Sequence, residues 1–185
     1  MSALDQMYQQ VILDHAKEKH GHGLRDVEGA LGESKQYNPL CGDEVTVRVA
    51  LTELDGGSPR VADVSWEGEG CSISQASVSV LHDLLAGHRL SEAEQVVDAF
   101  RTMIRSRGEI EGDEEVLGDA AAFQGVSRLV SRVKCAMLGW TAFEAAVLAA
   151  RAASGTVEES AAPGTRPAAT QSEGSTPGSG IEENR

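Results

Sequence analysis

Three cysteines and one aspartate are the residues whose types and positions predict chemistry in this sequence. Cys41, Cys71 and Cys135 are the only cysteines among 185 residues, and Asp43 follows Cys41 after a single glycine. An odd number of cysteines argues against a framework of disulfides. Thiolates are preferred ligands of soft and borderline metals such as zinc and iron. These residues therefore favour metal binding or thiol chemistry.

Each cysteine lies at the boundary of an expected element. Cys41 precedes the first long strand, Cys71 follows the second strand, and Cys135 stands near the start of the last helix. A hairpin returns the end of its second strand to the beginning of its first, so Cys41 and Cys71 can become neighbours. Three thiolates leave the fourth position of a tetrahedral zinc open. Asp43 could fill it, because residues two apart on an extended segment project toward the same face.

The surroundings of the cysteines could also adjust the charge of such a site. Three thiolates and a carboxylate around Zn²⁺ would be negative overall, and Arg132 and Lys134 would partly offset that charge. A helix that begins near Ser72, with Gln75 as its capping partner, would place its positive end close to Cys71. That placement would lower the pKa of the thiol.

Other interpretations of these residues stay open. Free cysteine is often buried as a small hydrophobic residue, and none of the three forms a CxxC pair. His15, His20 and His22 offer a competing metal site, although their pattern is more typical of surface histidines. The two tryptophans, Trp66 and Trp140, are expected to belong to the core.

Composition excludes several classes of function. The chain has 29 Asp and Glu against 16 Lys and Arg, a formal net charge of −13, and only 4% aromatic residues. Such a surface repels phosphate backbones and has few platforms for stacking bases, so nucleic-acid binding is disfavoured. No run approaches 18 consecutive apolar residues, and the start of the chain does not resemble a signal peptide. We therefore expect a cytoplasmic protein that does not bind membranes.

The first part of the chain predicts a helix and a small sheet. Apolar residues from Leu4 to Ile12 recur with helical spacing, and Ser2 with Asp5 resembles a capping box. Residues 17–32 are expected to form a loop. Two alternating segments, 44–51 and 61–66, predict strands, and the Asp-Gly-Gly at 55–57 predicts the hairpin turn between them. Residues 33–38 could add a third strand, so the expected sheet is antiparallel.

The remainder predicts helices followed by a tail. One apolar face begins at Ile73 and ends before Gly87, and Ser91 with Glu94 is expected to cap the next helix. The acidic stretch 109–119 is interpreted as a solvated loop and helix start. The last helix is expected to run from about Cys135 to Ala152. From Ser154 to Arg185, 21 of 32 residues are Ser, Gly, Thr, Ala or Pro, which predicts disorder. We therefore expect one domain over 1–152 and a disordered tail over 153–185.

Several segments together resemble the SufU family, which belongs to the IscU-like group of iron–sulfur assembly proteins. The segments with this resemblance are 38–43, 68–77, 132–136 and the first helix through His15. The resemblance covers about residues 1–152. Lys134 occupies the position before the third cysteine at which IscU proteins have histidine, and the acidic stretch 109–119 fits an insertion found in SufU proteins. The family's Pro-Arg-Asn after the first helix is replaced around 19–23, and its Phe-Pro is here Leu129-Val130.

The resemblance implies an α+β fold of the IscU/SufU type, in which helices pack on a small antiparallel sheet. It implies zinc bound by Cys41, Asp43, Cys71 and Cys135. It also implies a sulfurtransferase function: the protein would accept persulfide sulfur from a pyridoxal-phosphate cysteine desulfurase of the SufS type and pass it to downstream iron–sulfur assembly proteins. Cys41 is the expected acceptor, because it lies between Pro39 and a glycine on the most flexible segment. The alternatives are a scaffold that assembles an iron–sulfur cluster and a structural zinc module that binds partners.

Overall fold

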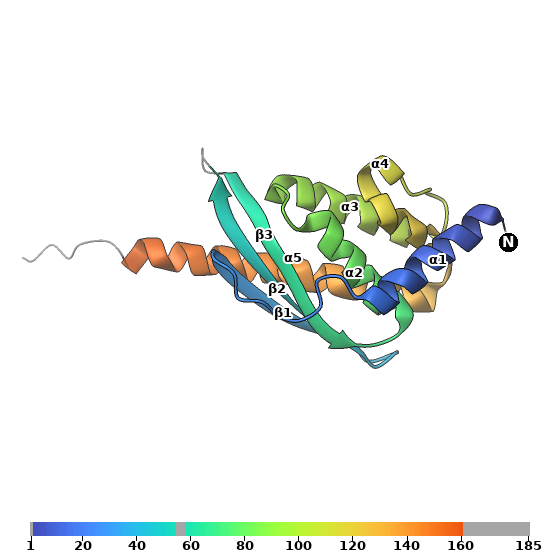
Figure 1. Cartoon of the computed structure of the whole chain (residues 1–185), viewed down its shortest axis with the longest axis horizontal. Helices are drawn as coiled ribbons and strands as arrows, with labels where there is room; N and C mark the ends of the chain where they lie inside the picture. Colours follow the sequence, from blue (N-terminus) through green and yellow to red (C-terminus); the bar gives the residue numbers. More distant parts are fainter. Residues whose placement is uncertain (1, 55–57, 161–185) are drawn as a thin grey trace, which may run out of the picture.

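A three-stranded sheet covered by helices makes up the computed structural model, which describes residues 2–54 and 58–160 (Figure 1). The predicted α+β architecture is confirmed. In chain order the elements are α1 (Ala3–Glu18), β1 (Ala30–Asn38), β2 (Asp43–Leu54), β3 (Ser58–Glu69), α2 (Ser72–Leu85), α3 (Leu90–Arg105), α4 (Glu114–Leu117), the 3₁₀ segment η1 (Gly118–Arg128) and α5 (Val130–Ser160).

The sheet is antiparallel throughout, in the order β1-β2-β3. Its alternating valines give β2 one buried face, and Val47 and Val49 lie opposite Trp66 and Val64 of β3. The strands are longer than the period-two pattern predicts, because backbone pairing continues past the alternating segments, between 52–54 and 58–60 and between 44–46 and 67–69. The predicted turn at 55–57 lies outside the described residues, but the pairing of the strands on either side of it is antiparallel as expected.

Strand β1 starts at Ala30, so the loop expected to reach residue 32 is shorter than predicted. Helix α5 lies against β1 and β2. At Gly32 a side chain would collide with the backbone of α5 at Ala146 and Ala150. The glycine thus permits the close approach of helix and strand.

Helix α1 begins as the sequence predicts. Ser2 accepts a hydrogen bond from the Asp5 N–H at 3.1 Å, and the Asp5 carboxylate accepts from the Ser2 N–H at 2.8 Å, so the capping box is confirmed. The helix ends at Glu18, and its C-cap residue, Lys19, has a φ of +51°. The chain then runs along the free edge of β3, where the Trp66 N–H donates to the Gly21 carbonyl.

The predicted cap of α3 is wrong. The helix begins at Leu90, with Arg89 as its N-cap, and the Arg89 N–H donates to the Glu92 carboxylate at 3.2 Å. Leu90 is fully buried, so its packing in the core starts the helix before the Ser91–Glu94 pair could cap it. The acidic stretch 109–119 is mostly exposed and contains the start of α4, as predicted.

Helix α5 is longer than the alanine-rich pattern predicts, because it begins at Val130 and continues to Ser160, beyond the end expected near Ala152. The rest of the predicted tail, 161–185, lies outside the described residues. By length and composition, residues Val130–Ser154 could cross a membrane, but 61% of their most apolar window is buried inside the structure. The helix packs on the sheet, and Trp140 is buried in the core, as is Trp66. Its hydrophobicity is explained by this packing.

Candidate metal centre

Four segments converge at one end of the sheet and bring the three cysteines together. Cys41 lies in the turn between β1 and β2, and Asp43 is the first residue of β2. Cys71 is the N-cap residue of α2, and Cys135 lies in the first part of α5. The turn at Cys41 is tight, because Gly42 has a φ of +73° and its N–H donates to the Asn38 carbonyl at 2.8 Å.

The potential ligand atoms lie within a few ångströms of one another. The Sγ atoms of Cys41 and Cys135 are 3.1 Å apart, and the Cys71 Sγ lies 3.8 Å from Oδ2 of Asp43. One ligand atom from each of Cys41, Asp43 and Cys135 lies within 4.8 Å of the other two. Cys41, Asp43 and Cys135 therefore surround one small volume, and Cys71 lies beside it through its contact with Asp43.

Asp43 is held in place by the N-terminus of α2. Its carboxylate is buried, and Oδ1 accepts a hydrogen bond from the Cys71 N–H at 2.9 Å. A Cβ at Gly70 would lie 2.7 Å from the same oxygen, so the glycine makes room for the carboxylate. The predicted capping box of Ser72 and Gln75 does not form, because the Gln75 side chain donates to the Gly70 carbonyl instead.

Asn38 is a site residue that the sequence analysis missed. It is buried, and its Nδ2 lies 3.5 Å from the Cys135 Sγ as a donor. Its Oδ1 accepts from the Leu40 N–H at 3.2 Å, which closes the turn that contains Cys41. The only sequence signal for this role is an Asn two residues before Leu40, because Asn side chains often bond to the backbone two residues on.

The three thiols differ in exposure and in electrostatic surroundings. Burial, together with hydrogen bonds involving Asp43 and Cys41, raises the pKa of the fully buried Cys135 thiol. Cys41 and Cys71 are partly exposed. The guanidinium Nη1 of Arg132 lies 3.8 Å from the Cys41 Sγ, where its charge offsets that of a thiolate. Lys134, expected to act in the same way, instead lines a groove with Ile104 and Met137.

These residues fit zinc in donor type, and the two contacts among them lie near the separations that zinc requires. A tetrahedral zinc with ordinary bond lengths separates two sulfur ligands by about 3.8 Å and a sulfur from an oxygen ligand by about 3.6 Å. The Cys71–Asp43 distance of 3.8 Å is close to that value. The Cys41 and Cys135 sulfurs, 3.1 Å apart, would have to separate by roughly 0.7 Å. Such a shift is within the range of side-chain rotation.

The three histidines do not form one site. His15 is buried, so its interpretation as a surface histidine is wrong; the packing of α1 against α2 encloses it. Its ring lies edge-on to that of His20, with centroids 5.0 Å apart. The His22 ring instead lies edge-on to Trp66. One ring nitrogen each of His15 and His20 lies near a carboxylate oxygen of Asp83.

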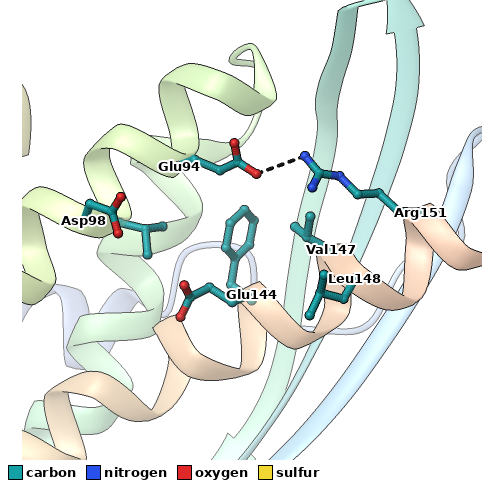
Figure 2. Close-up of a pocket in the computed structure, with 8 residues that line it drawn as sticks. Glu94, Asp98, Glu144, Val147, Leu148 and Arg151 are labelled. Atoms are coloured by element: carbon teal, nitrogen blue, oxygen red, sulfur yellow. Dashed lines mark hydrogen bonds and ion pairs between the residues drawn. The ribbon is translucent and has the colours of Figure 1, made fainter.

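A hollow of about 320 Å³ between α3 and α5 lies apart from these groups (Figure 2). Its lining combines apolar side chains with ionic ones: Glu94, Val97, Asp98, Phe143, Glu144, Val147, Leu148 and Arg151. The carboxylates are already paired, since Arg151 contacts Glu94 at 2.9 Å and Arg101 contacts both Asp98 and Glu144. Its lining has no cysteine or histidine and its carboxylates are paired with arginines, so this hollow is not a candidate for the thiol chemistry.

Comparison with known proteins defines the class to which this fold and site belong. Residues 7–136 match the family described as the NifU-like N terminal domain. The zinc-dependent sulfurtransferase SufU of Bacillus subtilis is 39% identical over 146 residues, which cover 78% of this chain and 91% of that protein. The iron–sulfur cluster assembly scaffold protein IscU of Streptococcus pyogenes is 33% identical over 147 residues, which cover 80% of this chain and 86% of the relative.

Solved structures show the same relationship. A SufU from Fervidobacterium islandicum, described as an assembly scaffold for the SUF system, is 33% identical with a TM-score of 0.60, covering 77% of this chain and 97% of that one. A NifU-like N-terminal domain from Brucella abortus is 26% identical with a TM-score of 0.65, covering 82% and 99%. The chain therefore belongs to the NifU-like N-terminal domain family. Within it, the predicted resemblance to the SufU and IscU proteins is confirmed.

Proposed function

We propose that this protein is a zinc-dependent sulfur acceptor of iron–sulfur cluster assembly. It would take persulfide sulfur from a SufS-type cysteine desulfurase and pass it to downstream assembly proteins. The observation that supports this most directly is the convergence of three thiols and a carboxylate, with one thiol on an exposed turn. Similarity to a protein named as a zinc-dependent sulfurtransferase favours the same function.

The four ligands have different freedom to move. Cys135 is buried in a helix and contacts Asn38, and Asp43 is held by the N-terminus of α2. Cys41 lies in a turn closed by backbone hydrogen bonds to Asn38 and is not itself part of a helix or strand. Zinc, when bound, keeps the thiols deprotonated at neutral pH. Cys41 is therefore the thiol that can leave the ligand set with the least disturbance.

Sulfur transfer then follows ordinary thiol exchange. The Cys41 thiolate attacks the terminal sulfur of the persulfide on the desulfurase. The sulfur–sulfur bond of that persulfide breaks, and the partner's cysteine leaves as a thiolate with the bonding electron pair. Arg132, 3.8 Å from the Cys41 sulfur, is placed to stabilise the negative charge that the attacking and transferred sulfurs carry.

Desulfurase turnover in the presence and absence of this protein tests the proposal. With a SufS-type desulfurase and excess cysteine, alanine formation should rise several-fold on addition of the zinc-loaded protein, whose metal content is measured on the same sample. The zinc-free protein should not stimulate the desulfurase, and stimulation should return when zinc is added back. No stimulation by a fully zinc-loaded sample would contradict the proposed function and favour a structural zinc module.

A cluster-assembly scaffold is the second candidate function. The names of the IscU relatives favour it, and thiolates are also ligands of iron–sulfur clusters. Anaerobic reconstitution with iron and sulfide separates the two candidates. A stable visible chromophore that transfers intact to an apo-ferredoxin would support the scaffold, whereas zinc that resists displacement by iron would support sulfur transfer.

A further inference from the structure

A second group of potential ligands lies where α1 and the loop after it meet α2. His15 is on α1, His20 follows its end, and Asp83 is on α2. One ring nitrogen of each histidine and one carboxylate oxygen of Asp83 all lie within 4.8 Å of one another. His15 is buried, whereas His20 is partly exposed and Asp83 is exposed, so the group opens to solvent on one side.

Both imidazoles present the same nitrogen, Nδ1, toward α2. His15 Nδ1 lies 2.9 Å from the Ser79 hydroxyl, and His20 Nδ1 lies 2.6 Å from Oδ2 of Asp83. Ser79 and Asp83 are four residues apart on the helix and therefore lie on one face. The two inward nitrogens and the Asp83 carboxylate thus converge on a single turn of α2.

The outward nitrogens make a different kind of contact. His15 Nε2 lies 3.1 Å from Oδ2 of Asp119, and His20 Nε2 lies 2.9 Å from Oε2 of Glu18. A histidine that binds a metal through one nitrogen almost always donates its other N–H to a carboxylate or carbonyl. Such a bond fixes the tautomer and the ring orientation, and both histidines here have it.

The backbone around His20 is also fixed before any ligand arrives. Its N–H donates to the Ser79 hydroxyl at 2.9 Å, and its carbonyl accepts from the Trp66 indole at 2.7 Å. The residues on either side, Lys19 and Gly21, have positive φ values that turn the loop back onto α2. A side chain at Gly21 would collide with His82, so the turn depends on this glycine.

The charge of the group favours a divalent cation. Three carboxylates, from Glu18, Asp83 and Asp119, surround two imidazoles. With neutral imidazoles, the three carboxylates give the group a charge of −3, and a bound dication would reduce it to −1. Imidazole and carboxylate ligands suit zinc, iron(II) and cobalt(II).

We propose that His15, His20 and Asp83 form a second metal site, for a divalent transition metal bound by nitrogen and oxygen ligands. The site is separate from the cysteine centre: Ser79 lies eight residues after Cys71 on α2, a rise of roughly 12 Å. Water would complete the coordination sphere on the open side. The proposal stands on this geometry alone and does not depend on the function proposed for the cysteines.

Cobalt(II) titration of the metal-free full chain tests the proposal. We expect two cobalt ions per chain by equilibrium dialysis, only one of which gives the near-ultraviolet thiolate-to-cobalt absorption. Asp83→Ala and His20→Gln should each lower the stoichiometry to one and leave the thiolate absorption unchanged. His22→Ala, in the same loop but outside the group, is the matched control and should keep both ions.

A variant with an impaired cysteine centre separates the two sites. In Cys41→Ser, cobalt should still raise the melting temperature, whereas the double variant Cys41→Ser with Asp83→Ala should lose that rise. A single cobalt per wild-type chain with full thiolate absorption would overturn the second site but not the cysteine centre. A single cobalt without thiolate absorption would contradict the cysteine centre only. Retention of the second ion in both Asp83→Ala and His20→Gln would also overturn the proposal.

Discussion

The Asp43 carboxylate contacts both the backbone N–H and the sulfur of Cys71. One oxygen accepts the Cys71 N–H at 2.9 Å, and the other lies 3.8 Å from its Sγ. The start of β2 and the start of α2 are thereby joined at the metal centre. Because the N-terminus of a helix carries a partial positive charge, the carboxylate is favoured there even without metal. Asp43 therefore has a structural role that is independent of its proposed role as a ligand.

Two substitutions at Asp43 separate these roles. Asp43→Asn keeps an acceptor for the Cys71 N–H but removes the negative ligand, so the metal-free protein should keep nearly its full stability while zinc affinity falls. Asp43→Ala removes both functions and should also lower the free energy of unfolding by about 1–3 kcal/mol, because a part-buried N–H loses its partner. Urea unfolding in chelator and zinc competition titrations measure the two effects. Equal zinc affinity in all three proteins would show that Asp43 is not a ligand.

Asn38 is expected to hold Cys135 and the Cys41 turn through different atoms. Asn38→Asp keeps the acceptor for the Leu40 N–H but replaces the donor that faces the Cys135 sulfur. It should raise the rate of zinc release to a chelator several-fold, because a carboxylate repels the adjacent thiolate. Asn38→Ala should also make Cys41 react faster with an alkylating agent in the zinc-free protein, because the turn loosens.

The matched control for Asn38 is Ser127→Ala, which removes the hydrogen bond of another buried side chain, that of Ser127 to the Gln124 carbonyl. It should lower stability without changing zinc release or alkylation. Zinc release from Asn38→Asp at the wild-type rate would show that the contact with Cys135 does not matter to the metal.

His20 gives the metal-free protein a defined pH dependence. The hydrogen bond to Asp83, followed by the one to Glu18, raises the pKa of His20. The contribution of protonated His20 to stability is therefore fully present below the pKa of the unfolded state, about 6.5. It is lost as the pH rises through the higher pKa of the folded state. The stability difference between wild type and His20→Gln should be largest at low pH and shrink as the pH rises. Urea unfolding in chelator over this range measures it, and a difference that grows with pH would contradict the assignment.

The features that follow from local pattern could be predicted from the sequence. The alternation of valines in β2 predicts its buried face directly. The Ser2–Asp5 capping box could be predicted because it joins residues only three positions apart. The hairpin predicts that the start of its first strand lies beside the end of its second, and the structure has Asp43, two residues after Cys41, in contact with Cys71.

The features that the sequence analysis missed depend on packing between distant elements. Leu90 starts α3 because it is buried in the core. The neighbouring sequence carries no sign of this burial, so the Ser91–Glu94 pattern predicts the wrong start. His15 is buried because α1 packs on α2, whereas its own helix is polar around it. The contact of Asn38 with Cys135 joins residues 97 positions apart, which spacing along the chain does not reveal.

Cys41 is expected to carry the transferred sulfur, because all three thiols can bind metal but only this one lies in a turn. Cys71 is fixed as the N-cap of α2, and Cys135 is fully buried in α5. After a single turnover with labelled cysteine and the desulfurase, peptide mass analysis should find the extra sulfur mainly on the Cys41 peptide. Cys41→Ala should abolish stimulation of the desulfurase, while circular dichroism shows a folded chain. Label mainly on the Cys71 or Cys135 peptide, or full stimulation by folded Cys41→Ala, would refute the assignment and leave Cys41 as a metal ligand alone.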